Sequence, residues 1–174
     1  MKKFIMEKDF LQIFPDAKIG ILVCNGIDNH IKDENRYADY LAEAQREAAK
    51  HITNPEFTEN PIIRTWRDAF YKFKTKKGAR CSIEALLKRV SKGGEIGCIN
   101  PLVDIYNGIS LKYGVPVGGE DIDKFQGDNR LTVETAAKNS SPTAATRASR
   151  LIRERWYIRT MEEPSADALT GASR

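Results

Sequence analysis

Residues Ile99 to Val133, INPLVDIYNGISLKYGVPVGGEDIDKFQGDNRLTV, contain the clearest series of structural signals in the chain. Asn100-Pro101 is typical of a helix start, because proline fits the first helical position. Gly114 stands where the end of this helix favours a left-handed residue. After it we expect a short extended VPV segment, a glycine-rich turn and a strand around 129–133. This stretch alone therefore predicts a domain that mixes helix and sheet.

Three further helices are expected upstream of this stretch. Asp33 can cap a helix that runs to about His51, and Asn60-Pro61 can open a second one. Ser82 can cap a third, SIEALLKRV, which the turn at Lys92-Gly93-Gly94 ends. The expected apolar faces are Tyr37, Leu41, Ala44 and Ala48 on the first helix and Ile62, Trp66, Phe70 and Phe73 on the second.

The first part of the chain carries one strand signal. Residues Lys18 to Cys24, KIGILVC, are short, apolar and rich in β-branched side chains, and Asn25-Gly26 closes them. We expect a buried strand there. Together these segments predict an α/β domain, α+β-like, with more helix than sheet.

Bulk composition limits the class of protein. A chain of 174 residues with 41% apolar and 30% charged residues suits one globular domain. No run approaches the ~18 apolar residues of a membrane span, and the N-terminus MKKFIMEKDF has acids too early for a signal peptide. Three widely spaced cysteines argue against a disulfide frame or a zinc site. We therefore expect a cytoplasmic protein with no membrane partner and no metal, and a net charge of +4 permits a nucleic-acid partner.

Common catalytic and cofactor motifs are missing from the sequence. There is no GxxxxGK[ST] loop and no GxGxxG between a strand and a helix, so we expect no nucleotide cofactor. His30 and His51 have no Cys, Asp or Glu at dyad or metal-ligand spacing, and surface positions are expected for both. Asp121 and Asp123 beside the glycine turn are expected to be solvated or to serve a helix N-terminus through its dipole.

One segment favours nucleic-acid binding. Residues 70–80, FYKFKTKKGAR, combine five cations with three aromatic residues and no acid. Cations neutralise phosphates while aromatic faces stack on unpaired bases. The cations are Lys72, Lys74, Lys76, Lys77 and Arg80. The alternative is that the aromatic residues belong to the core stripe and the lysines form a solvated face.

The composition changes after Val133. Residues 134–174 contain no valine or phenylalanine but eight alanines, and arginine outnumbers lysine 6 to 1 where lysine led 14 to 7 before. The mild interpretation is a disordered tail. A sharper interpretation is a frameshifted reading of an ordinary C-terminal half, since the break falls within an expected core strand. The predicted domains are accordingly residues 1–133 and an atypical tail, residues 134–174.

The stretch from Ile99 to Val133 also resembles a known family. Its Val103-Asp104, Asn107, Gly114 with Pro116, and Asp121-Ile-Asp-Lys124 match, in order, the pattern VVD.TNYV..E.G.P.HAFD.DK of the B3/B4 domain in the phenylalanyl-tRNA synthetase beta chain. The resemblance is closer to the free-standing bacterial proteins built on that domain. It covers roughly residues 10–133. It implies an α/β fold with helices packed on a mixed sheet, which the atypical tail would leave incomplete at the C-terminus.

In the synthetase this domain contacts tRNA and hydrolyses tyrosine wrongly attached to it. Water performs that hydrolysis in a positioning pocket, so little covalent apparatus is expected. The resemblance places the pocket around Asn107, Pro116, Gly118, Gly119, Glu120 and Asp121. Editing enzymes have a histidine where this chain has Gly118. We expect Gly118-Gly119 to adopt positive φ and to expose its amides.

The resemblance leaves two readings of function open. The first is an RNA-binding protein, associated with tRNA, that descends from an editing module and has weak or no deacylase activity. Its partners would be tRNA or another RNA and an aminoacyl or amino-acid ligand, with no DNA specificity. The alternative is a small-molecule module that kept the pocket and lost the RNA.

Overall fold

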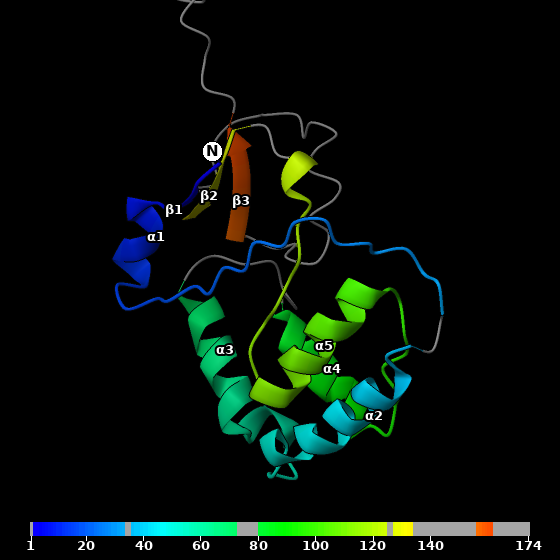
Figure 1. The fold of residues 1–174 in the computed structure, drawn as a ribbon. Helices are drawn as coiled ribbons and strands as arrows, with labels where there is room; N and C mark the ends of the chain where they lie inside the picture. Colours follow the sequence, from blue (N-terminus) through cyan, green and yellow to red (C-terminus); the bar gives the residue numbers. More distant parts are fainter. Residues whose placement is uncertain (1, 34–35, 73–79, 125–126, 134–155, 162–174) are drawn as a thin grey trace, which may run out of the picture. The chain divides into compact units, whose positions relative to one another are not determined.

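A computed structural model of the chain describes residues 2–33, 36–72, 80–124, 127–133 and 156–161 (Figure 1). Its elements, in chain order, are β1 (Phe4–Met6), α1 (Lys8–Ile13), α2 (Ala38–Glu47), η1 (Ala48–His51), η2 (Phe57–Glu59), α3 (Pro61–Tyr71), α4 (Ser82–Ser91), α5 (Pro101–Tyr113), η3 (Ile122–Lys124), β2 (Asp128–Val133) and β3 (Trp156–Met161), where η marks a 3-10 helix. They fall into two compact units. The sheet unit is Met1–Ile19 with Asp121–Arg174, and the helical unit is Gly20–Glu120.

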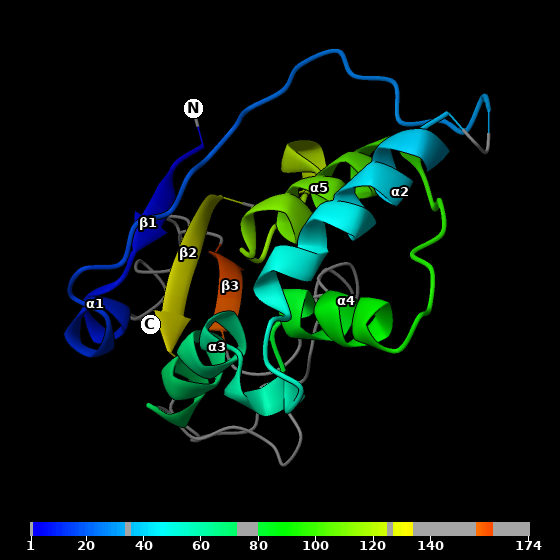
Figure 2. The same ribbon diagram turned by 90° about the horizontal axis from the view of Figure 1, so that it is seen from below.

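The sheet unit contains a three-stranded mixed sheet in the order β1-β2-β3 (Figure 2). β1 runs parallel to β2, with Phe4 opposite Asn129, and β2 runs antiparallel to β3 along its whole length. Helix α1 packs on β2 and buries Phe10, which is 3% exposed. The Asp9 carboxylate accepts hydrogen bonds from the Thr132 hydroxyl (2.6 Å) and the Val133 N–H (3.2 Å). The expected α/β class with a mixed sheet is confirmed.

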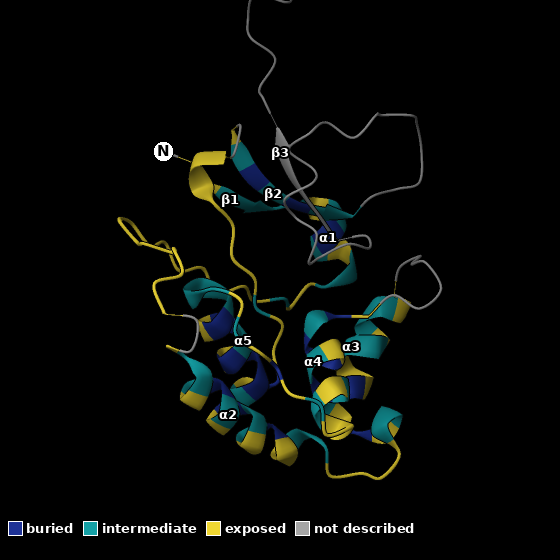
Figure 3. Cartoon of the chain, turned by 90° about the vertical axis from the view of Figure 1, so that its right-hand side faces the viewer, coloured by how far each residue is buried: buried dark blue, intermediate teal, exposed yellow. Residues whose placement is uncertain are grey.

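The helical unit is built around α5. Helices α2 and α4 pack against it, and their buried residues face inward (Figure 3). Gly108 allows the close approach of α2, because a Cβ there would lie 2.2 Å from the Tyr40 ring. The main core cluster consists of Ala44, Ala48, Ile63, Cys81, Ile83, Leu87, Ile96 and Leu111.

Both ends of α5 lie where the sequence predicts them. The Asn100 side chain accepts a hydrogen bond from the Val103 N–H at 3.0 Å, and proline occupies the first turn. A second asparagine, Asn29, accepts from the Leu102 N–H at 2.8 Å. Gly114 ends the helix with a φ of 67°. The start of α3 at Asn60-Pro61 and the turn after α4, where Gly93 has a φ of 74°, are also confirmed.

The predicted strand at Lys18–Cys24 is wrong. Those residues form no strand, and Leu22 is 87% exposed. A strand needs a backbone partner, and in the described part of the chain Lys18–Cys24 pairs with none of the three strands of the sheet. Conversely β1 and α1 are present without having been predicted.

The predicted start of the first long helix is also wrong. α2 begins at Ala38, because Tyr37 has the non-helical angles φ −111° and ψ 13°. The carbonyl of Asp33 instead accepts from the Arg36 N–H within a turn. Cys81 rather than Ser82 is the N-cap of α4. In the atypical tail the structure describes only β3, so the remaining predictions for residues 134–174 lie outside the described residues.

Candidate functional site

The loop that follows α5 lies along one side of that helix. A Cβ built on Gly119 would lie 3.1 Å from Leu102 Cδ2 and 3.5 Å from Tyr106 Cε1. A larger residue would have to displace the leucine, so glycine permits this close approach. Gly118, by contrast, has open space where a side chain would project, with nothing within 4 Å. The loop therefore presents one closely packed glycine and one free position.

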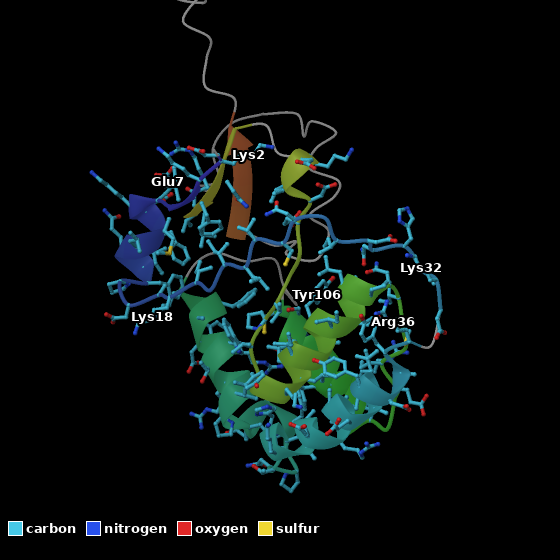
Figure 4. The ribbon with its side chains drawn as sticks, viewed as in Figure 1. Lys2, Glu7, Lys18, Lys32, Arg36 and Tyr106 are labelled. Atoms are coloured by element: carbon cyan, nitrogen blue, oxygen red, sulfur yellow. The ribbon has the colours of Figure 1, made fainter. Side chains whose placement is uncertain are left out.

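Tyr106 and Glu120 form the polar part of this site. Tyr106, labelled in Figure 4, is only 8% exposed, and burial raises the pKa of its hydroxyl, with further increases from the Glu120 and Asp104 carboxylates. Burial also raises the pKa of Glu120, although that residue as a whole is exposed. A carboxyl close to a buried phenol can exchange hydrogen bonds with a polar ligand.

The predicted pocket residues are only partly brought together. Gly118, Gly119 and Glu120 lie in the loop on α5, and Pro116 is exposed just before them. Asn107 is half-buried on α5, but consecutive helical residues point about 100° apart. Tyr106, not Asn107, is therefore the side chain that contacts Gly119.

Two expectations for this loop need correction. Neither Gly118 nor Gly119 has a positive φ; the glycines that do, on either side, are Gly114 and Gly127. The close packing on Leu102 explains a glycine at 119 without a left-handed backbone. Asp121 belongs to the sheet unit, where its carboxylate accepts from the Asp123 N–H at 3.0 Å.

Tyr106 was missed by the sequence analysis. The only available signal was its place directly before Asn107 in the matched motif.

The predicted cation cluster is described only at its two ends. Lys72 follows α3 and is exposed, while Arg80 precedes α4. Lys74, Lys76 and Lys77 lie outside the described residues. The Arg80 side chain is 46% exposed, and its Nε lies 3.7 Å from Oε1 of Glu84.

Glu84 also binds a second arginine, which the sequence analysis missed. Arg67 donates from Nη2 to Glu84 Oε1 at 2.8 Å and from Nε to both carboxylate oxygens at 3.3 Å. The Glu84 side chain is 2% exposed, so a buried carboxylate joins α3, α4 and Arg80, two residues before α4. Hydrogen bonding to Glu84, which outweighs the effect of burial, raises the pKa of Arg67. No periodic pattern signals a pairing between residues 17 positions apart.

Described residues of the helical unit line two cavities. One, of about 290 Å³, is lined by residues that include Asp33, Tyr37, Cys98 and Asp104. Burial raises the pKa of Cys98, as do the nearby Asp104 and Asp33 carboxylates, so its thiol is not an activated nucleophile. The second cavity, of about 330 Å³, is lined by Lys50, His51, Thr53, Pro61, Ile62 and Thr65.

The two histidines differ in their surroundings. His30 is exposed as expected, but its Nδ1 lies 2.7 Å from Asp28 Oδ1, so the prediction that no acid is spaced to pair with it is wrong. With 92% of its side chain exposed, His30 has no enclosed site around it. His51 is half-buried, and its Nε2 lies 3.1 Å from the Lys112 carbonyl oxygen. Within the described ranges, no group of three or more His, Cys, Asp or Glu could hold a metal ion.

No helix in the described part of the chain is long and apolar enough to cross a membrane.

The chain was compared with protein-family models, curated proteins and solved structures. No curated protein and no solved structure matches the chain. The family model of the B3/4 domain matches residues 65–163, which is more than half of the chain and includes α4, α5, the loop on α5, β2 and β3. This domain is found in the phenylalanyl-tRNA synthetase beta chain. The chain therefore belongs to the B3/4 domain family.

Proposed function

We propose that this chain binds RNA, with tRNA as its natural partner, and holds an aminoacyl or amino-acid group in the site on α5. The observation that carries the proposal is the approach of Gly119 to α5, which puts Tyr106 and Glu120 at one place in a B3/4 domain. A phenol donates one hydrogen bond, and an ionised carboxylate accepts from an ammonium group. These two groups suit an amino-acid-like ligand. A tRNA partner would also make the chain a cytoplasmic protein.

The proposed RNA contacts are the cations at the end of α3 and in the segment that follows. Lys72, Lys74, Lys76, Lys77 and Arg80 would neutralise phosphates without reading sequence. For binding of this kind, the logarithm of the association constant falls linearly with the logarithm of the salt concentration. The slope of that line is set by the number of phosphates neutralised. The slope is therefore the direct measure of this proposal.

Hydrolysis of misacylated tRNA would be weak or absent. Gly118 stands where editing enzymes of the resembling family have a histidine, and glycine offers no side chain to position the ester. The open space beside Gly118 is consistent with a missing side chain rather than a blocked one. Loss of one positioning group can lower a rate by orders of magnitude while binding persists.

The second candidate function is a small-molecule module without RNA. It is favoured by the contact between Arg80 and Glu84, since a paired arginine offers less charge to phosphate. Under this reading the Tyr106–Glu120 site would bind a free amino acid and the lysines would only be solvated.

A binding titration separates the two candidates. The affinity of the full chain for a tRNA mixture is measured between 50 and about 200 mM salt, for wild type and for the triple change of Lys74, Lys76 and Lys77 to Ala. RNA binding predicts a steep slope in wild type that becomes shallower by about two to three in the variant. No measurable tRNA binding, together with saturable binding of a free amino acid, would establish the alternative.

A further inference from the structure

Two partly exposed guanidinium groups converge on one buried carboxylate oxygen in the helical unit. Arg67 Nη2 lies 2.8 Å and Arg80 Nε 3.7 Å from Oε1 of Glu84. Because Glu84 neutralises only one of the two, the three side chains together carry a net charge of +1. The buried carboxylate fixes the two arginines close together, although they come from different parts of the chain.

Both arginines keep unused hydrogen-bond donors. Arg67 directs Nε and Nη2 to Glu84 and leaves Nη1 without a partner in the described part of the chain. Arg80 approaches Glu84 only through Nε, and its side chain is 46% exposed. A guanidinium carries five N–H donors in a planar fork that matches phosphate oxygens. A phosphate at this place could therefore accept hydrogen bonds from both arginines.

An exposed aromatic ring lies near Arg67, the first arginine of this pair. Tyr71 is one helical turn after Arg67 on α3, and residues four apart lie on the same side of a helix. Tyr71 is 81% exposed, so its ring packs against little of the protein. Exposed aromatic residues beside cations are the usual elements of single-stranded nucleic-acid contacts.

We propose that Arg67, Arg80 and Tyr71 form a binding site for one unpaired nucleotide, with the phosphate on the two arginines and the base stacked on the tyrosine. Glu84 is the positioning residue that holds the arginines in place. The inference rests on the proposed RNA function and deepens it, since it specifies a single-stranded segment of the RNA. A paired base has no free face for Tyr71, so duplex RNA would use the arginines alone.

The test compares three ligands on the full chain: a uridine octamer, an octamer of the same length with abasic sites, and an RNA duplex. The octamers carry the same backbone phosphates, so the difference between them isolates stacking. We expect the uridine octamer to bind about tenfold more tightly than the abasic one, as one stacked base would give. Tyr71→Leu should remove this difference, while Tyr71→Phe should keep it.

Matched variants separate this site from general effects. Tyr113 is 67% exposed on α5, so Tyr113→Leu makes the same change elsewhere and should leave the preference for the uridine octamer intact. Arg80→Gln keeps the Arg67–Glu84 pair and should weaken both octamers, with a salt slope shallower by about 0.7. Arg46→Gln, at an exposed position on α2, is the charge control and should change neither the affinity for the octamers nor the salt slope.

Equal affinity for the two octamers in wild type, or an unchanged preference in Tyr71→Leu, would overturn the nucleotide site. An unchanged salt slope in Arg80→Gln would show that the phosphate does not bind to Arg80. A tRNA arm distinguishes this inference from the proposed function. If tRNA binds but the Tyr71 variants do not change octamer binding, only the nucleotide site is wrong. If octamer binding depends on Tyr71 but tRNA does not bind, the site stands and the tRNA partner is wrong. If neither tRNA nor the octamers bind, both the nucleotide site and the proposed RNA function are overturned.

Discussion

The indole N–H of Trp66 donates a hydrogen bond to the carbonyl oxygen of Gly114 at 3.2 Å, which ties α3 to the C-terminal end of α5. His51 contacts the same end, with its Nε2 3.1 Å from the Lys112 carbonyl oxygen. The last carbonyls of a helix have no partner within it. These side chains supply partners, so the start of the candidate loop on α5 is held in place from two sides.

Replacing Gly114 with alanine should destabilise the protein. Its φ of 67° is left-handed, and a Cβ would lie 3.1 Å from both His51 and Ile62. We expect a loss of about 1–2 kcal/mol in the free energy of unfolding, measured by urea titration. Gly97→Ala is the control, since Gly97 has open space and no positive φ, and it should change stability little. Equal effects of the two changes would contradict this account of Gly114.

Removing the charge of Glu84 should be costly. Glu84→Gln leaves Arg67 and Arg80 without their buried partner, and breaking such a pair from one side is strongly destabilising. Because both arginines are partly exposed, we expect about 2 kcal/mol, which is below the ~3–5 kcal/mol for fully buried pairs. Glu59→Gln breaks an exposed pair with Arg64, 3.7 Å apart, and should cost close to nothing. Thermal unfolding of both variants tests this, and a neutral Glu84→Gln would refute it.

The raised pKa of Glu120 makes a pH prediction with a defined sign. Burial disfavours the ionised carboxyl in the folded state, so its contribution to stability is fully present below the ordinary value of 4.5 and is lost as pH rises through the folded pKa. The stability of wild type relative to Glu120→Gln should therefore fall as the pH rises from 4.5 to the folded pKa of Glu120. An NMR titration of the Glu120 side-chain carboxyl gives the folded pKa directly. A pKa at or below 4.5 would show that the carboxyl is solvated.

Restoring a histidine at position 118 should increase deacylation. The space beside Gly118 is open, so Gly118→His can be accommodated without displacing α5. We expect tyrosylated phenylalanine tRNA to be hydrolysed roughly tenfold or more faster than by wild type, because a histidine that only positions the ester contributes less than the ~10²–10⁴-fold of a general acid or base. Gly119→His is the control, because its side chain would collide with Leu102. High activity in wild type itself would show that Gly118 does not limit the reaction.

Local sequence signals predicted the helices and turns that surround the site. They could not predict contacts between segments that are far apart in the sequence. α5 was predicted at both ends because Asn100, Pro101 and Gly114 act within a few residues of their position. Lys18–Cys24 has the composition of a strand, but composition does not show whether a partner strand is available. The Arg67–Glu84 pair and the contact of Gly119 with Tyr106 depend on the packing of separate segments. The interpretation of residues 134–174 as a frameshift stays a prediction, which resequencing the locus would test.

The pairing of β2 on both sides has a consequence for any shortened form of this protein. All six residues of β2 are paired with β3, which lies beyond Val133. A chain that stopped at Val133 would convert an interior strand into an open edge, with a row of unpaired N–H and C=O groups. Such edges recruit strands from other molecules. A premature stop codon after residue 133 would therefore be expected to yield self-associating fragments rather than a smaller folded domain.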